Sequence, residues 1–148
     1  MIAVGGTLLG SIITFTFQRR SSAQADLFAR SQQLRQERMT TYSAYAGAVT
    51  TLKQGTVALW FCLQGDADSP ERRQAFTECD RLGAAAENAQ FRVRLLAEDD
   101  RLIALAASAF DAIGPIRRAS TRTELAEREA DLQSALSTFI TAAAVQIH

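Results

Sequence analysis

Side chains able to carry out chemistry are few in this sequence, and their spacing favours structural roles. The single histidine, His148, is the last residue. A histidine-containing catalytic triad in an ordered core and the Glu-x-x-His ligands of di-iron bundles are therefore excluded. Cys62 and Cys79 are too few for a disulfide framework, and without a second histidine they do not make a structural zinc set. We interpret both as free thiols that pack like small apolar side chains.

Acidic side chains gather at 98–100 and again at 124–131. Paired carboxylates can do acid–base work or bind divalent ions. The first cluster, however, falls at a predicted helix junction, and the second falls in the first turns of a predicted helix, where the helix dipole favours acids. The sequence also contains no phosphate-binding loop. We therefore predict no catalytic residue, no cofactor, no metal site, and a protein that is not an enzyme.

The charge balance excludes another class of function. Sixteen basic residues offset sixteen acidic residues, so the formal net charge is zero. Without a global positive field, nucleic acid is not expected as a partner. The rest of the composition, 47% hydrophobic and 22% charged, is typical of a globular domain.

The first elements of the chain are predicted to tether it to a membrane. Residues 2–17 carry no charge, and 17 residues of helix reach about 25 Å, near the lower limit for crossing a bilayer. We predict a transmembrane anchor over residues 1–18. Arg19 and Arg20 follow directly, which places the C-terminal body in the cytoplasm by the positive-inside rule and makes this a single-pass cell-membrane protein. A buried core helix and a cleaved signal peptide are the alternatives.

Gly6, Gly10 and Thr14 recur every four residues inside this segment. Small residues at that spacing share one helix face and let two helix backbones approach closely in lipid. We therefore interpret these three residues as a helix-packing face, whose partner is another copy or a different membrane protein.

Beyond the anchor, the pattern predicts an all-α protein. Residues 19–38 contain no glycine or proline and are expected to form a helical stalk, and residues 39–148 an antiparallel bundle of three or four helices. An amphipathic stripe begins at Met39, and Gly65 and Pro70 bracket the clearest break. A second helix is expected over 70–97, a short third one is expected to be stopped or kinked at Gly114–Pro115, and a Thr121-x-x-Glu124 capping box starts the last.

Trp60 and Phe61 are adjacent, so a helix cannot turn both toward one core. One of them is expected to lie partly outside the bundle, where an exposed aromatic side chain favours a partner surface. The alternative is that a further helix covers it.

Several short segments together carry a family resemblance: Phe17-Gln-Arg, Gln33-Leu-Arg-Gln-Glu-Arg-Met39, Tyr42-Ser-Ala-Tyr-Ala-Gly47 and Phe91-Arg-Val-Arg-Leu95. In these the chain resembles uncharacterised small membrane-anchored helical proteins of high-GC Gram-positive bacteria. The resemblance implies the layout of anchor and bundle, and it implies no activity and no site residue.

Two functions fit these observations. The first is a non-enzymatic, membrane-tethered helical interaction module that self-associates or serves as an accessory subunit of a larger membrane complex. Its partners would be membrane lipid and either itself or another membrane protein. The alternative is a membrane-anchored bundle that senses a ligand in an apolar pocket near Trp60.

Overall fold

A computed structural model describes the backbone of residues 6–147 and the side chains of residues 25–147. Over these residues all regular structure is helical, which confirms the predicted all-α class. The helices are α1 (Gly6–Leu63), α2 (Pro70–Leu96), α3 (Asp100–Asp111), the short α4 (Ile113–Arg117) and α5 (Arg122–Ile147). The chain divides into two compact units, Met1–Glu37 and Arg38–His148.

The first unit contains the N-terminal part of α1. Where its side chains are described, at residues 25–37, they are exposed, including Leu27 and Phe28. Among the described residues, no helix offers a stretch long and apolar enough to cross a membrane. The predicted anchor, and with it the side chains at Gly6, Gly10 and Thr14, lies outside the residues whose side chains are described. Anchor, stalk and packing face stay predictions.

Local capping explains where the helices of the second unit begin. The Ser69 hydroxyl accepts a hydrogen bond from Arg72 N at 3.2 Å, and Pro70 occupies the first turn of α2. A carboxylate oxygen of Asp99 accepts from Arg101 N at 2.8 Å at the start of α3. Each cap satisfies a backbone N–H that the helix leaves unpaired.

Thr121 caps α5 as the sequence predicts. Its hydroxyl accepts from Glu124 N at 3.1 Å. The returning bond differs from the standard capping box, because Glu124 Oε2 accepts from Ser120 N at 2.8 Å rather than from Thr121 N. This bond is the main reason why the pKa of Glu124 is lowered.

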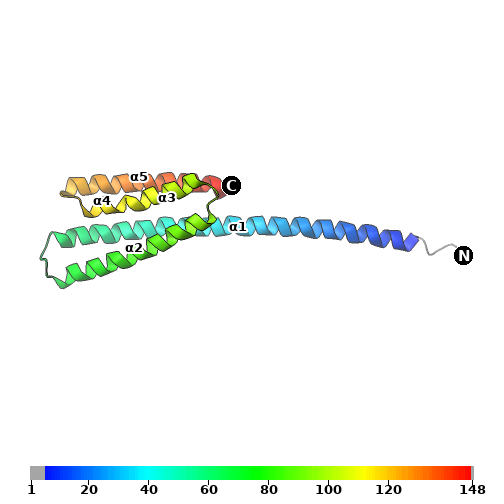
Figure 1. Ribbon diagram of the computed structural model, residues 1–148, viewed down its shortest axis with the longest axis horizontal. Coiled ribbons are helices and arrows are strands. Elements are labelled where there is room, and N and C mark those ends of the chain that lie inside the picture. Colours follow the sequence, from blue (N-terminus) through cyan, green and yellow to red (C-terminus); the bar gives the residue numbers. More distant parts are fainter. Residues whose placement is uncertain (1–5, 148) are drawn as a thin grey trace. The chain divides into compact units, whose positions relative to one another are not determined.

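Within the second unit, the helices pack as an antiparallel bundle (Figure 1). The end of α5 lies beside the start of the bundle segment of α1, where the Tyr42 hydroxyl donates a hydrogen bond to Gln146. The start of α5 lies beside the end of α1, because Arg122 covers the ring of Phe61. The core between the helices is built from apolar side chains, of which the largest fully buried ones include Tyr45, Phe139, Leu59, Leu102 and Ile116.

The packing of α1 against α2 depends on Leu82. This residue is buried, whereas Phe76 on the same helix is partly exposed. The reason is Gly55 on α1, which leaves room for Leu82: a Cβ on Gly55 would lie 2.6 Å from Leu82 Cδ1. The missing side chain at Gly55 therefore lets Leu82 reach α1.

Candidate functional site

Several reactive groups in the described residues are engaged in local structure. No group of three or more His, Cys, Asp or Glu residues among them is arranged to hold a metal ion. Cys62 and Cys79 are free thiols, and Cys79 Sγ lies 3.6 Å from the Thr56 hydroxyl. Glu98 pairs with Arg38. These arrangements offer no general base held beside a nucleophile.

Of the two adjacent aromatic residues, Trp60 and Phe61, one is buried and the other is partly exposed. Trp60 is buried, and its Nε1–H donates to the Ala119 carbonyl at 2.7 Å. Phe61 is 44% exposed and meets the Trp60 ring edge-on, with 5.1 Å between the centroids. The guanidinium of Arg122 lies 5.2 Å from the Phe61 centroid, a cation–π distance. Whether Phe61 contacts a partner stays a prediction.

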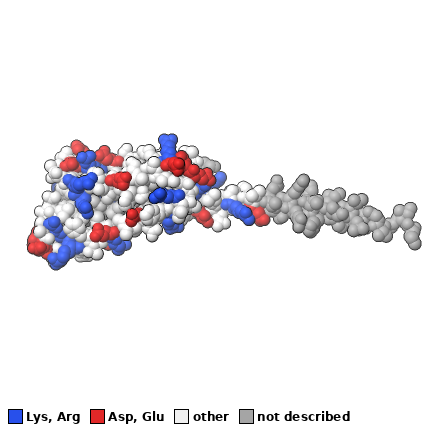
Figure 2. All heavy atoms as spheres, in the orientation of Figure 1, with Lys and Arg blue, Asp and Glu red and all other residues white. Residues whose placement is uncertain are grey.

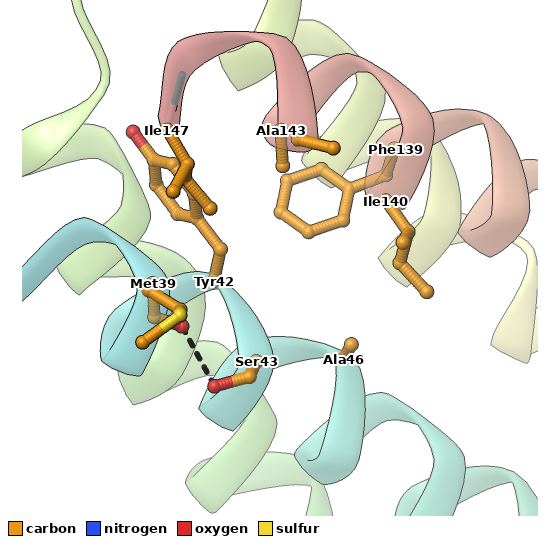
Figure 3. Close-up of a pocket in the computed structure, with 9 residues that line it drawn as sticks. Met39, Tyr42, Ser43, Ala46, Phe139, Ile140, Ala143 and Ile147 are labelled. Atoms are coloured by element: carbon orange, nitrogen blue, oxygen red, sulfur yellow. Dashed lines mark hydrogen bonds between the residues drawn. The ribbon is translucent and has the colours of Figure 1, made fainter. Parts of the chain in front are cut away.

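An apolar groove lies at the other end of the seam between α1 and α5, with a volume of about 260 Å³ (Figure 3). Its lining residues are Met39, Tyr42, Ser43, Ala46, Phe139, Ile140, Ala143, Ala144 and Ile147. Phe139 and Tyr42 are buried and form the floor, whereas Met39 and Ile140 are about half exposed and form the rims. The groove includes neither Trp60 nor Phe61.

Helical periodicity explains why these side chains meet. Met39, Tyr42, Ser43 and Ala46 follow one another at steps of three, one and three on α1, so they share one face. The same spacing joins Phe139, Ile140, Ala143, Ala144 and Ile147 on α5. The small side chains among them leave the hollow open.

The polar groups of the groove already have partners. The Ser43 hydroxyl lies 2.7 Å from the Met39 carbonyl and 3.1 Å from the Thr40 carbonyl, so its proton stays within α1. The Tyr42 hydroxyl donates to Gln146 Oε1 at 3.1 Å, with the Leu96 carbonyl at 3.5 Å. Burial is the main cause that raises the pKa of Tyr42. At neutral pH the groove is therefore an uncharged apolar surface.

Charge is distributed unevenly among the helices. In α1 the segment Thr40–Leu63 has one charged residue, Lys53, in 24 positions, and the segment Leu132–Ile147 of α5 has none in 16. By contrast, α2 carries nine charged residues in 27 positions. On the face of the bundle drawn in Figure 2, acidic and basic side chains are intermixed, with no single-sign patch.

The helical bundle matches a known protein family. The KilB plasmid transfer protein family model matches residues 39–147. The chain belongs to the KilB family. The KilB match spans the bundle segment of α1 through α5 and contains every residue that lines the groove. Searches of curated proteins and of solved structures found no match. The family match does not show that the chain belongs with the membrane-anchored proteins of high-GC Gram-positive bacteria, so that likeness stays a resemblance.

The groove of this KilB chain was not predicted from the sequence. Its two walls are about 100 positions apart along the chain, and each wall by itself resembles an ordinary apolar helix stripe. One usable signal is the scarcity of charge in 40–63 and 132–147. An exposed helix face without charged side chains is unusual for a surface that faces solvent and is typical of a contact surface.

Proposed function

We propose that the chain takes part in plasmid transfer as a non-enzymatic, membrane-tethered interaction module, an accessory subunit of a larger membrane complex. The observation that carries the proposal is the family match over residues 39–147, which is the whole helical bundle. The groove supports an interaction role because its polar groups are satisfied internally while its rims expose apolar side chains.

The membrane part of the proposal rests on the sequence. Residues 2–17 are uncharged and Arg19 and Arg20 follow them. This arrangement favours a single-pass anchor with the bundle on the cytoplasmic side. A tether would concentrate the bundle at the membrane, where a transfer complex that moves DNA between cells has to operate.

A transfer assay tests both parts together. A plasmid lacking this gene is complemented with the full chain, with a chain lacking residues 1–18, or with a chain whose residues 1–18 are replaced by an unrelated single-pass anchor. We expect transfer to fail without the segment and to recover with the unrelated anchor, and the bundle to follow the membrane fraction in the same pattern. Normal transfer without the gene would reject the role, and normal transfer by the truncated chain would reject the tether.

A second test identifies the complex. Affinity purification of the tagged, full-length chain from native membranes in mild detergent, followed by mass spectrometry, is expected to recover another transfer protein in stoichiometric amount. Recovery of the chain by itself would contradict the accessory-subunit proposal.

Ligand sensing remains the second candidate, and the groove is the observation that favours it. An environment-sensitive apolar dye is expected to brighten on binding the groove, and Ala144→Trp at the exposed rim is expected to abolish the signal. Equal dye fluorescence with both proteins would count against a ligand at this position.

A further inference from the structure

The seam of α1 and α5 forms one continuous face of the bundle, here called the α1/α5 face. At one end Met39 and Ile147 line the groove, and at the other end Arg122 covers Phe61. Over this length α1 contributes one charged residue, Lys53, between Thr40 and Leu63. The α5 helix contributes none between Leu132 and Ile147 but six between Arg122 and Asp131, at the end near Phe61. The half-exposed Met39, Ile140 and Phe61 add apolar surface.

The face is large enough for a stable protein contact. From Met39 to Phe61 the helix advances about 33 Å at about 1.5 Å per residue. Two adjacent helices, each about 10–12 Å across, span about 20 Å. The face therefore offers about 650 Å² in projection, close to the roughly 800 Å² that each partner contributes to a standard interface.

We propose that the α1/α5 face binds the same face of a second copy of this chain, about a two-fold axis parallel to the helices. This proposal deepens the interaction role proposed above, on which it rests, by naming a partner and a surface. At the groove end the face has little charge to attract a charged partner, because Leu132–Ile147 of α5 carries none. A second copy presents the same apolar surface there, so the contact at the groove buries no unpaired charge.

The axis fixes which side chains meet. In a two-fold contact each patch faces its own copy, so α1 of one chain lies on α5 of the other. Ser43 and Ile140 line the same groove from opposite walls. The rotation therefore sets Ser43 of one copy against Ile140 of the second copy. An axis along the helices also keeps both bundle segments of α1 pointing the same way, as two chains tethered to one membrane require.

A small polar ligand suits the groove less well than a second copy does. Ligand sites use a few free polar groups to orient the molecule they bind. Here the Ser43 hydroxyl is bonded to backbone carbonyls of its own helix, and the Tyr42 hydroxyl is bonded to Gln146. What the groove presents is apolar rims and small side chains, which accept the apolar side chains of another helix surface.

Self-association of the purified full-length chain in mild detergent tests the proposal. Sedimentation equilibrium gives the dimer dissociation constant for the wild type, for Ile140→Glu, and for the matched control Val145→Glu. Val145 is 75% exposed on the same helix and does not line the groove. We expect Ile140→Glu to raise the dissociation constant at least about tenfold, because it buries an unpaired carboxylate, and Val145→Glu to leave it within about twofold.

A mixing experiment tests the geometry. Ser43→Lys is expected to weaken self-association in the same way as Ile140→Glu, and an equimolar mixture of the two variants is expected to associate more tightly than either variant by itself. Tight self-association of Ile140→Glu, a monomeric wild type, or a mixture no tighter than its components would overturn the proposal. Far-ultraviolet circular dichroism checks that each variant remains helical. These outcomes do not depend on plasmid transfer, so a failed dimer and a failed transfer role are distinguishable.

Discussion

Replacing Gly55 with alanine tests how closely α1 and α2 approach. A Cβ at this position would lie 2.6 Å from Leu82 Cδ1, well inside a normal contact. The Leu82 side chain is buried with Leu52 and Ala86, so a shift of its methyl group disturbs the packing of this cluster. Gly83→Ala in α2 is the matched control, because nothing lies within 4 Å of a Cβ there.

The expected magnitudes follow from two opposing effects. Removing glycine from a helix interior stabilises a protein by about 0.8–1 kcal/mol. For Gly83→Ala nothing opposes this gain. For Gly55→Ala the overpacking at Leu82 costs about 1–3 kcal/mol, so the net change is a loss of roughly 0–2 kcal/mol. The two variants are thus expected to differ by about 1–3 kcal/mol in the free energy of unfolding.

Urea unfolding of the full-length chain in mild detergent, followed by circular dichroism, measures the difference. Truncating Leu82 to alanine in both the wild-type and the Gly55→Ala background completes a double-mutant cycle. We expect a coupling free energy of at least about 0.5 kcal/mol, because the shorter side chain makes room for the new Cβ. Equal stability of the two glycine variants, or zero coupling to Leu82, would refute the close approach of α1 and α2.

Three further predictions address other contacts of the bundle. Trp60→Phe is expected to lower the free energy of unfolding by about 1–3 kcal/mol, because it removes the hydrogen bond to the Ala119 carbonyl and leaves a small cavity. Denaturant unfolding measures this change, and an unchanged midpoint would contradict the buried hydrogen bond. Thr121→Ala is expected to lower it by about 1 kcal/mol through loss of the α5 cap, whereas the exposed neighbour Thr123→Ala should change it little, and equal effects would argue against the cap. Burial raises the pKa values of Tyr42 and Tyr45 above the usual value of about 10. As the pH rises, the unfolded chain therefore loses these protons before the folded chain does. The contribution of the two tyrosines to the free energy of unfolding is complete below about pH 10 and decreases as the pH rises beyond it. Tyr45→Phe is expected to flatten that fall in unfolding experiments at a series of alkaline pH values, and an identical slope would contradict the assignment.

The starts of α2 and α5 were predictable because the signals that set them are local. The break expected at Gly114–Pro115 was not, because α3 ends earlier, at Asp111, and both residues lie inside α4. Ser69 with Pro70, and Thr121 with Glu124, act within one turn of helix. The buried side chains of α5 follow the spacing of one helix face, and they are Leu125, Leu132, Leu136, Phe139 and Ala143. A cap or a stripe can be identified from a few neighbouring residues.

The groove and the role of Leu82 were not predictable because they depend on residues distant in the chain. Leu82 is buried only because Gly55, 27 positions earlier, carries no side chain. The groove is lined by side chains of two helices, among them the small Ala46 on α1 and Ala143 on α5. Which of Trp60 and Phe61 is buried also depends on a residue distant in the chain, because the Ala119 carbonyl accepts the hydrogen bond of the buried Trp60 indole.

The contact between Tyr42 and Gln146 joins residues 104 positions apart, and this has a consequence for how the protein matures. Closing a segment of that length opposes folding by about 4 kcal/mol plus a constant, from the (3/2)RT ln n relation. During synthesis α5 leaves the ribosome after α1 to α4, so the apolar stripe of α1 stays uncovered until α5 has emerged. Translation that stops before Phe139 would leave Tyr45 without its edge-on aromatic neighbour. Such truncated chains are expected to be recognised by chaperones and proteases rather than to accumulate.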